Sequence, residues 1–424
     1  MESGAATSRG RSCQSFRGVA LGRAEPHVGA MADANPQKTA LAVTATVEGN
    51  RLTLLPDGPQ RLDALIALID EAQESLRILY YIFLADESGR RVRDALVAAV
   101  ERGVQVSLLV DDFGSDTTKE EFFRPLTETS CEFCRFSPRF GRRYLLRNHQ
   151  KLALADGRRV IIGGFNISDD YFGTVESGAW RDLGLEVEGD GVACLTRYFD
   201  DLFKWARDPK SKIRTLRRML QQHSETEGKL PWLFGGPTRR HSPWARAVRR
   251  DLRQARRLDL IAAYFAPSPG LLRRSGNVAR RGGRARLVTA SKSDNKATIG
   301  AARHSYWLLL KRGVEIYEYQ PTKLHTKLFV LDDVVHIGSA NFDMRSLFLN
   351  LEMMLRVDDP GFAEAMHRFV DAEIKDSVRI TRESHRAERT WINRIKWGIA
   401  YFLVAIADYG ISHRLNFGGE PKPG

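Results

Sequence analysis

The chain has 424 residues, of which 43% are hydrophobic and 28% charged, so it can fold into two domains and does not resemble a disordered or fibrous protein. Its formal net charge of +13 indicates a polyanionic partner, either an anionic membrane surface or a nucleic acid. The four cysteines are too few and too scattered for a disulfide scaffold. No run of about 18 apolar residues, the length that spans a bilayer, occurs in the sequence.

The chain begins with a segment of a different kind, residues 1–45, which is rich in Gly, Ala, Ser and Arg and has no hydrophobic periodicity. We expect a disordered arm, a leader-like segment, or an extension upstream of a true start at Met31. A predicted amphipathic helix over 62–69 follows, and then a buried strand over 76–83. A second helix ends at Gly103, before another apolar strand.

The same order of elements returns in the second half of the chain. A helix is predicted over 245–257, a strand over 258–265, and a weaker helix over 271–281 that closes at Gly282. Strands that alternate with helices predict an α/β fold with mainly parallel sheets covered on both sides. The return of the pattern at a nearly constant offset indicates a duplicated domain.

These patterns divide the chain after the N-terminal arm. We expect a first half over 46–207, a basic linker over 208–244, a second half over 245–380, and a basic and apolar tail over 381–424. Within the tail, Trp397–Ala407 is apolar and aromatic and has basic flanks. It is predicted either to lie at a membrane interface or to pack on the core, and both interpretations remain open.

One array of polar residues occurs once in each half. In the first half His149, Lys151 and Asp156 are followed by Gly164 and Asn166. The residues around His149 alternate in character, so His and Lys are expected on one face of a strand that turns at the aspartate and returns toward the asparagine.

The second half repeats the array. His325, Lys327 and Asp332 stand at the same spacing and are followed by Ser339 and Asn341. A Lys at +2 and an Asp at +7 from a His recur by chance in roughly one of several hundred histidines, so two matched copies indicate a shared catalytic function.

These arrays resemble the HKD motifs of the phospholipase D superfamily, and their surroundings are most similar to bacterial cardiolipin synthases and related phosphatidyltransferases. The resemblance implies two tandem phospholipase-D-like α-β-α sandwich halves, related by a pseudo-two-fold axis, with the active site at their interface. It rests on RNHQKLALADGRRVIIGGFNISDDYFG and WRDLGLEVEG in the first half, and on ASKSD, GVEIYEYQPTKLHTKLFVLDD and GSANFDMRSLFLNLEMMLRV in the second.

The chemistry of phosphodiester transfer assigns roles to these residues. The two lysines and the two asparagines are expected to bind the non-bridging phosphate oxygens, with Gly164 and Ser339 allowing close approach of the backbone. One histidine must be neutral to attack phosphorus and the other protonated to donate to the departing alcohol. The resemblance implies that His149 is the nucleophile and His325 the acid.

Carboxylates are expected to support this machinery. Nearby lysines would depress the pKa of both imidazoles, so each histidine needs a carboxylate behind it, and Asp182 and Glu352 are the candidates. Asp156 and Asp332 complete the catalytic motifs, although we expect them to hold the loop rather than touch substrate. Five strand aromatics are predicted to be core or to line a channel: Tyr80, Tyr81, Trp180, Tyr264 and Phe265.

The sequence therefore predicts phospholipid phosphodiester transfer or hydrolysis through a phosphohistidine. The main alternatives are cardiolipin-synthase-like phosphatidyl transfer and hydrolysis to phosphatidic acid. An HKD nuclease is disfavoured because one chain carries both motifs. We expect no metal and no other cofactor, a phospholipid at an anionic membrane surface as partner, and a monomer sufficient for one active site. The expected location is peripheral on the cytoplasmic face of a membrane, with secretion as the alternative.

Overall fold

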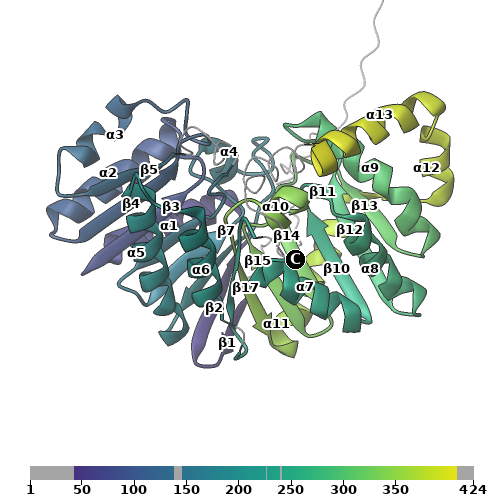
Figure 1. Ribbon diagram of the computed structural model, residues 1–424, viewed down its shortest axis with the longest axis horizontal. Coiled ribbons are helices and arrows are strands. Elements are labelled where there is room, and N and C mark those ends of the chain that lie inside the picture. Colours follow the sequence, from purple (N-terminus) through teal and green to yellow (C-terminus); the bar gives the residue numbers. More distant parts are fainter. Residues whose placement is uncertain (1–42, 138–145, 226, 239–240, 408–424) are drawn as a thin grey trace, which may run out of the picture. The chain divides into compact units, whose positions relative to one another are not determined.

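The computed structural model describes residues 43–137, 146–225, 227–238 and 241–407 (Figure 1). The arm before residue 43 and the end of the tail, 408–424, lie outside this part of the chain. Within it, two eight-stranded sheets and one two-stranded sheet are flanked by helices. The two large sheets correspond to the two predicted halves.

The first half builds a sheet in the order β1-β2-β8-β7-β6-β3-β4-β5. Helix α1 forms where the apolar spacing predicts it, with Leu62, Leu65 and Ile69 buried. The strands of the first half are β1 (Thr44–Val47), β2 (Asn50–Leu55), β3 (Ser75–Tyr80), β4 (Gln105–Asp111), β5 (Glu132–Phe136), β6 (Leu152–Ala155), β7 (Arg159–Gly163) and β8 (Gly184–Glu188). Its helices are α1 (Gly58–Glu71), α2 (Glu87–Glu101), α3 (Glu120–Thr127), α4 (Asp169–Phe172) and α5 (Cys194–Arg207).

The second half builds a sheet in the order β18-β13-β12-β10-β14-β15-β17-β9, and β11 pairs with β16. Its strands are β9 (Trp232–Gly235), β10 (Arg257–Ala262), β11 (Phe265–Ala266), β12 (Arg284–Ala290), β13 (Glu315–Tyr319), β14 (Lys327–Leu331), β15 (Val334–Gly338), β16 (Phe342–Asp343), β17 (Glu352–Asp358) and β18 (Ser377–Ile380), and its helices are α7 (Pro243–Gln254), α8 (Pro269–Arg280), α9 (Lys296–Lys311), α10 (Met344–Phe348) and α11 (Pro360–Lys375).

The duplication predicted from the sequence is present in the structure. Strands β3 and β10 occupy equivalent central places, and helices α2 and α8 precede equivalent strands. Gly103 and Gly282 follow these helices with φ of 90° and 86°, a conformation that L side chains rarely adopt. The α/β class and the two tandem halves are confirmed.

The prediction of mainly parallel sheets is wrong in its detail. Only β3–β4–β5 and β10–β12–β13 run parallel, and all other neighbouring pairs in the two large sheets of the described chain are antiparallel. The reason is local. The strands that carry the catalytic motifs, β6 and β14, turn back directly into β7 and β15, and a tight turn can only join antiparallel strands.

The two sheets share one core. Successive residues of β6 point to opposite faces: Leu152 and Leu154 join a core that also contains Leu328 and Val330 of β14, whereas Ala153 and Ala155 pack on the α1 side. Helices α5 and α11 contribute to the shared core. The halves therefore meet through apolar sheet faces, which brings the His–Lys ends of β6 and β14 to the same junction.

The segment predicted as a basic linker is largely structured. Within 208–244, helix α6 (Ile213–Gln222) buries Leu216, Met219 and Leu220. Strand β9 pairs with β17 and so forms the edge of the second sheet, starting the second half 13 residues before the predicted boundary at 245. The high content of Lys and Arg in residues 208–244 hid the short apolar run that forms β9.

The C-terminal segment forms helices α12 (Arg382–Glu388) and α13 (Trp391–Tyr401), continued by a π-helical turn over Phe402–Ala407. Helix α13 lies beside α9 (Figure 1). Trp397 and Tyr401 are buried in this contact, and the Tyr401 hydroxyl donates to the Pro267 carbonyl at 2.8 Å. No helix in the described ranges is long and apolar enough to cross a bilayer.

The motif aspartates sit at the turns after β6 and β14. Asp156 and Asp332 have φ of 52° and 51°, a region that aspartate tolerates better than most residues. The Asp156 carboxylate accepts N–H groups of Gln73, Glu74 and Ser75 at 2.8–3.0 Å. Five residues of extended chain, about 16 Å, separate Asp156 from Lys151. Grouping the aspartates with the catalytic residues is therefore corrected: they tie the turn to the neighbouring strand.

We predict that Asp332→Ala lowers the free energy of unfolding by about 1–3 kcal/mol, because it removes the acceptor of the Arg256 and Arg257 N–H groups at 2.7–3.1 Å and places Ala at positive φ. Urea denaturation measures the loss. The kcat of the folded fraction should stay within a few-fold of the starting protein. A loss of kcat as deep as that of a histidine variant, with unchanged stability, would contradict this role.

Candidate active site

The two motif histidines lie at the junction of the halves, immediately before strands β6 and β14. The backbone N–H of His149 donates to Leu351 O at 2.9 Å, and that of His325 donates to Arg181 O at 2.7 Å. Leu351 belongs to the second half and Arg181 to the first. Each catalytic segment is thus fixed by main-chain bonds to the other half.

Each imidazole is also held by a carboxylate from the opposite half. His149 Nδ1 lies 3.1 Å from Glu352 Oε2, and His325 Nδ1 lies 2.6 Å from Asp182 Oδ2. Both carboxylates are fully buried. Donation of Nδ1–H to the carboxylate leaves Nε2 as the nitrogen for chemistry in both rings. The two predicted supporting carboxylates are therefore in place, in a crossed arrangement that the sequence does not reveal.

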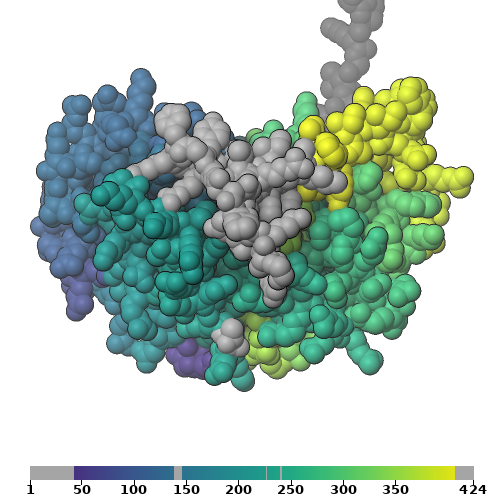
Figure 2. All heavy atoms as spheres, in the orientation of Figure 1, coloured from purple at the N-terminus to yellow at the C-terminus, as the bar shows by residue number. Residues whose placement is uncertain are grey.

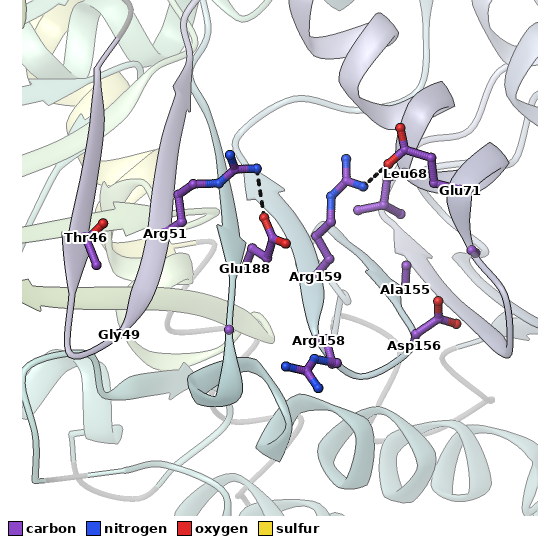
Figure 3. Close-up of a pocket in the computed structure, with 12 residues that line it drawn as sticks. Thr46, Gly49, Arg51, Leu68, Glu71, Ala155, Asp156, Arg158, Arg159 and Glu188 are labelled. Atoms are coloured by element: carbon purple, nitrogen blue, oxygen red, sulfur yellow. Dashed lines mark hydrogen bonds and ion pairs between the residues drawn. The ribbon is translucent and has the colours of Figure 1, made fainter.

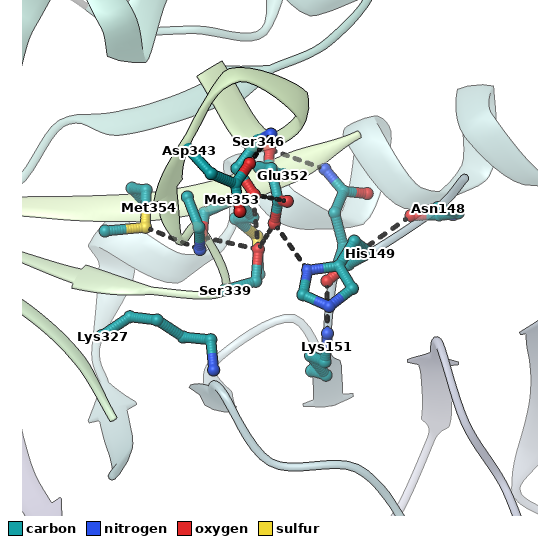
Figure 4. Close-up of polar contacts among 12 residues, drawn as sticks. Asn148, His149, Lys151, Lys327, Ser339, Asp343, Ser346, Glu352, Met353 and Met354 are labelled. Carbon is teal, nitrogen blue, oxygen red and sulfur yellow. Dashed lines mark hydrogen bonds and ion pairs between the residues drawn. The ribbon is translucent and has the colours of Figure 1, made fainter. Parts of the chain in front are cut away.

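Two lysines occupy the same buried site (Figure 4). Lys151 Nζ donates to His149 O at 2.6 Å, and Lys327 Nζ lies 2.8 Å from His325 Nδ1. Burial lowers the pKa of Lys151 to about 7, and the charge of Lys327 adds to the effect while Glu352 opposes it. Burial likewise lowers the pKa of Lys327 to about 8, against the opposing charge of Asp182.

The same environment acts on the histidines. Burial and the charge of Lys151 lower the pKa of His149, although Glu352 opposes them. Burial and Lys327 lower the pKa of His325 to about 4, against the effect of Asp182. Both rings are therefore neutral near pH 7 in the free site. An incoming phosphate anion favours protonation, so it supplies the condition under which one ring becomes the acid.

The glycine of the first motif makes room for this cluster. A Cβ on Gly164 would lie 2.5 Å from Asp182 Oδ1 and 2.9 Å from Lys327 Cδ, so the site accepts no side chain here. The equivalent Ser339 contributes its side chain instead, because its hydroxyl donates to Glu352 Oε2 at 2.5 Å. The Ser339 hydroxyl thus orients the carboxylate behind His149, and close approach of the Ser339 backbone to substrate phosphate stays a prediction.

The two motif asparagines differ. Asn166 Oδ1 accepts the Ile82 N–H at 3.2 Å, and its Nδ2 donates to the Tyr171 hydroxyl at 3.0 Å, so its amide is engaged in holding the loop. Asn341 is buried, and its Oδ1 has no hydrogen-bond partner among the described residues. Phosphate binding stays a prediction for both.

Aromatic rings surround the imidazoles. Tyr81 lies edge-on to His149 with ring centroids 4.9 Å apart, and Trp180 and Tyr264 lie 5.4 and 6.2 Å from His325. These three of the five aromatics border the catalytic rings, whereas Tyr80 and Phe265 are core residues. The three bordering rings restrict water around the imidazoles, which strengthens electrostatic interactions there.

Sequence reasoning missed two residues that position the carboxylates. Ser346 Oγ donates to Glu352 Oε1 at 2.7 Å. Arg61 is buried and donates to the carbonyls of Asp182 and Tyr171, each at 2.7 Å. The available signal for Arg61 was its place beside Leu62, on the buried side of a predicted amphipathic helix, where a charge needs partners.

A pocket on the first half does not belong to this site. It lies at the turn end of the sheet, and its charged groups are paired: Arg51 with Glu188 at 2.8 Å, and Arg159 with Glu71 (Figure 3). Asp156 also borders it, at the end of β6 opposite to the histidines. In the described ranges no three His, Cys, Asp or Glu side chains gather as metal ligands, and the lysines supply positive charge at the catalytic junction.

Comparison with known proteins agrees with this geometry. The family described as "Cardiolipin synthase, PLD-like domain" matches residues 65–200 and 248–373, one match in each half. The chain therefore belongs to this phospholipase-D-like family. Cardiolipin synthase B of Salmonella typhimurium strain LT2 is 31% identical over 394 residues, covering 89% of this chain and 94% of the relative. Cardiolipin synthase B of Escherichia coli K12 is 30% identical over 371 residues, covering 84% and 88%.

A solved structure has the same fold. Phosphatidylserine synthase of Haemophilus influenzae Rd KW20 superposes with a TM-score of 0.66 at 14% identity, covering 85% of this chain and 95% of that one. At this identity the likeness concerns architecture alone. It confirms the tandem arrangement of the two halves.

We predict that anion binding takes up protons. The lysines, with pKa near 7 and 8, are partly neutral at pH 7–8, and a bound anion favours their charged forms, so affinity for sulfate should fall at least tenfold from pH 6 to pH 9. Calorimetry in two buffers of different ionisation enthalpy measures the proton uptake. Lys151→Met should flatten the dependence, and pH-independent sulfate binding by the unaltered protein would contradict the account.

Proposed function

We propose that this protein transfers phosphatidyl groups between lipid alcohols, as a cardiolipin synthase does. The observation that carries the proposal is the buried pair of His–Lys sets, in which each histidine is held by a carboxylate of the other half. Relatives named cardiolipin synthase, at 30–31% identity over most of the chain, favour lipid transfer over other phosphodiester chemistry.

The reaction proceeds in two balanced steps. His149 Nε2 attacks phosphorus, the bond from phosphorus to the departing alcohol breaks, and His325 gives that alcohol its proton. In the second step an acceptor hydroxyl gives its proton to His325 and attacks phosphorus, and the bond from phosphorus to His149 breaks. Lys151 and Lys327 neutralise the phosphate oxygens throughout.

The choice of His149 as nucleophile is part of the proposal. Its side chain is 12% exposed and that of His325 is 5% exposed, so His149 is the more open of the two. Its Glu352 partner receives hydroxyl donors from Ser339 and Ser346, which fix the carboxylate and hence the ring. A fixed neutral ring suits attack on phosphorus.

Hydrolysis is the alternative outcome of the same intermediate. If water replaces the acceptor alcohol, the product is phosphatidic acid and the enzyme is a phospholipase D. An HKD-type nuclease is less favoured, since one chain supplies both motifs and the lipid-synthesising relatives match over nearly their full length. Because both halves belong to one chain, a monomer suffices for the site.

We predict that His149→Ala and His325→Ala each reduce turnover of phosphatidylglycerol vesicles by more than a hundredfold, as expected when a nucleophile or its proton donor is removed. Mass analysis of the products, with and without added glycerol, separates cardiolipin from phosphatidic acid. Activity should be insensitive to EDTA. Retention of a tenth of the starting rate by either variant would contradict the paired mechanism.

The proposed function also needs access to a lipid surface, and the C-terminal helices lie on the surface of the molecule, in yellow in Figure 2. Apolar side chains at helical spacing are 44–72% exposed along α13 and the π-helical turn that continues it: Trp391, Ile392, Ile395, Ile399, Phe402 and Leu403. Residues 389–407 contain Arg389, Arg394 and Lys396 but no acidic residue. Apolar side chains beside basic ones match an anionic membrane surface.

Two other occupants of this face fit less well. A second copy would bring the same basic residues together, which opposes self-association. Residues 1–42 carry five Lys or Arg and three acidic residues, so they do not offer complementary charge. We therefore propose a peripheral membrane protein that docks through α13. The described cysteines, Cys131, Cys134 and Cys194, are free, which favours the cytoplasmic face over secretion.

We predict that Ile395→Glu combined with Phe402→Glu weakens binding to phosphatidylglycerol vesicles at least tenfold, because both side chains, on α13 and on the π-helical turn that continues it, are more than half exposed and insertion would bury the new charges. Vesicle co-sedimentation measures binding, and Val378→Glu, an equally exposed position on β18, is the matched control. Equal binding by both variants would contradict the assignment of α13 as the membrane-binding surface. Conversion of a dimer to a monomer by the α13 changes would contradict it as well.

A further inference from the structure

One carboxylate beside the catalytic centre takes no part in the mechanism above. Asp294 lies in the loop between β12 and α9. Its Oδ1 accepts the Tyr264 hydroxyl at 2.6 Å and the Ser293 hydroxyl at 2.9 Å. The Tyr264 ring stands edge-on to His325, with centroids 6.2 Å apart. The pair Tyr264–Asp294 thus borders the imidazole assigned to proton transfer.

The aligned position in the first half carries no carboxylate, although Asp111 and Asp116 lie near Tyr81 there. Leu108 pairs with Ile78 on β3, and Leu287 pairs with Leu260 on β10, so the two loops can be aligned by counting from these residues. Seven positions later stand Ser115 and Asp294. Ser115 is fully buried and serves the backbone, accepting the Phe83 N–H and donating to Tyr81 O, whereas Asp294 is exposed. The active site is chemically asymmetric at this point.

Asp294 remains ionised. Its partial burial opposes this, but the hydrogen bonds from Tyr264 and Ser293 and the nearby His325 hold the pKa of Asp294 below its usual value. A fixed negative charge repels a phosphodiester. It suits neutral hydroxyl groups, because an ionised carboxylate accepts about four hydrogen bonds and two are already made.

We propose that Asp294 and Tyr264 form a binding subsite for the vicinal hydroxyls of a polyol alcohol on the His325 side, that is, the glycerol-type headgroup that departs or attacks. The inference rests on the proposed function and adds a substrate class to it. One hydroxyl of the polyol exchanges its proton with His325, and the neighbouring hydroxyl donates to Asp294. Alcohols with a single hydroxyl, and water, cannot make the second bond.

The test compares acceptors rather than total rates. With phosphatidylglycerol vesicles as donor, transfer to deuterium-labelled glycerol and to 1-propanol is measured in one competition assay by product mass. For Asp294→Asn the ratio of glycerol to propanol product should fall about tenfold, since a hydrogen bond to a charged group is lost. Any change in His325 basicity acts on both acceptors and cancels in the ratio. Tyr264→Phe should lower the ratio less, and Asp333→Asn, an exposed acid at the turn after β14, is the matched control.

A second arm uses the departing alcohol, so that the subsite is tested even if the enzyme only hydrolyses. Release of glycerol from phosphatidylglycerol is compared with release of 1-propanol from phosphatidylpropanol, an alcohol that also needs the proton of His325, and Asp294→Asn should lower the first relative to the second about tenfold. An unchanged ratio in both arms overturns the subsite, as does an equal loss for polyol and monohydroxyl substrates. If the unaltered enzyme gives no transfer product, the proposed transfer is refuted. A ratio that Asp294→Asn still lowers in the second arm would then support the subsite on its own.

Discussion

The structure depends on a crossed pairing at the junction of its halves: Glu352 of the second half holds His149 of the first, and Asp182 of the first holds His325 of the second. Main-chain bonds reinforce the exchange in both directions. Neither half supplies the carboxylate that holds its own histidine. Duplication therefore does more than double a motif, because the shared apolar core between the sheets is what brings the four groups into one site.

The electrostatics of the site follow from its burial. Two lysines and two histidines sit together in a nearly closed junction, and burial lowers the pKa of all four. Protonating them costs free energy in the empty site, and a phosphate anion offsets that cost. Substrate binding and protonation of the acid are thus one coupled event. The carboxylates behind the rings limit how far the pKa of each imidazole falls. Asp182 stays ionised despite its burial because Lys327 and His325 lower its pKa.

The candidate catalytic residues could be identified from sequence because their spacing is local: His and Lys stand two positions apart in the segment that leads into a strand, and the aspartate occupies the turn that ends that strand. Contacts between residues far apart could not be predicted in this way. The crossed carboxylates join residues 203 and 143 positions apart, and no periodicity encodes which half supplies which partner. The same limit hid the bond from the Ser339 hydroxyl to Glu352, since this contact is defined by the fold of β15 against β17. Strand β9 was missed because basic neighbours masked four apolar-rich residues.

The most direct test of the account is to trap the covalent intermediate with a phosphatidyl ester of p-nitrophenol, a leaving group that needs no general acid. Digests of the unaltered enzyme and of His325→Ala, quenched in denaturant at neutral pH and analysed by peptide mass, should carry the phosphatidyl group on the peptide with His149, and His325→Ala should accumulate more of it because the second step lacks its base. Label on the peptide with His325, or a normal burst of p-nitrophenol from His149→Ala, would contradict the assignment of nucleophile and base across the two halves.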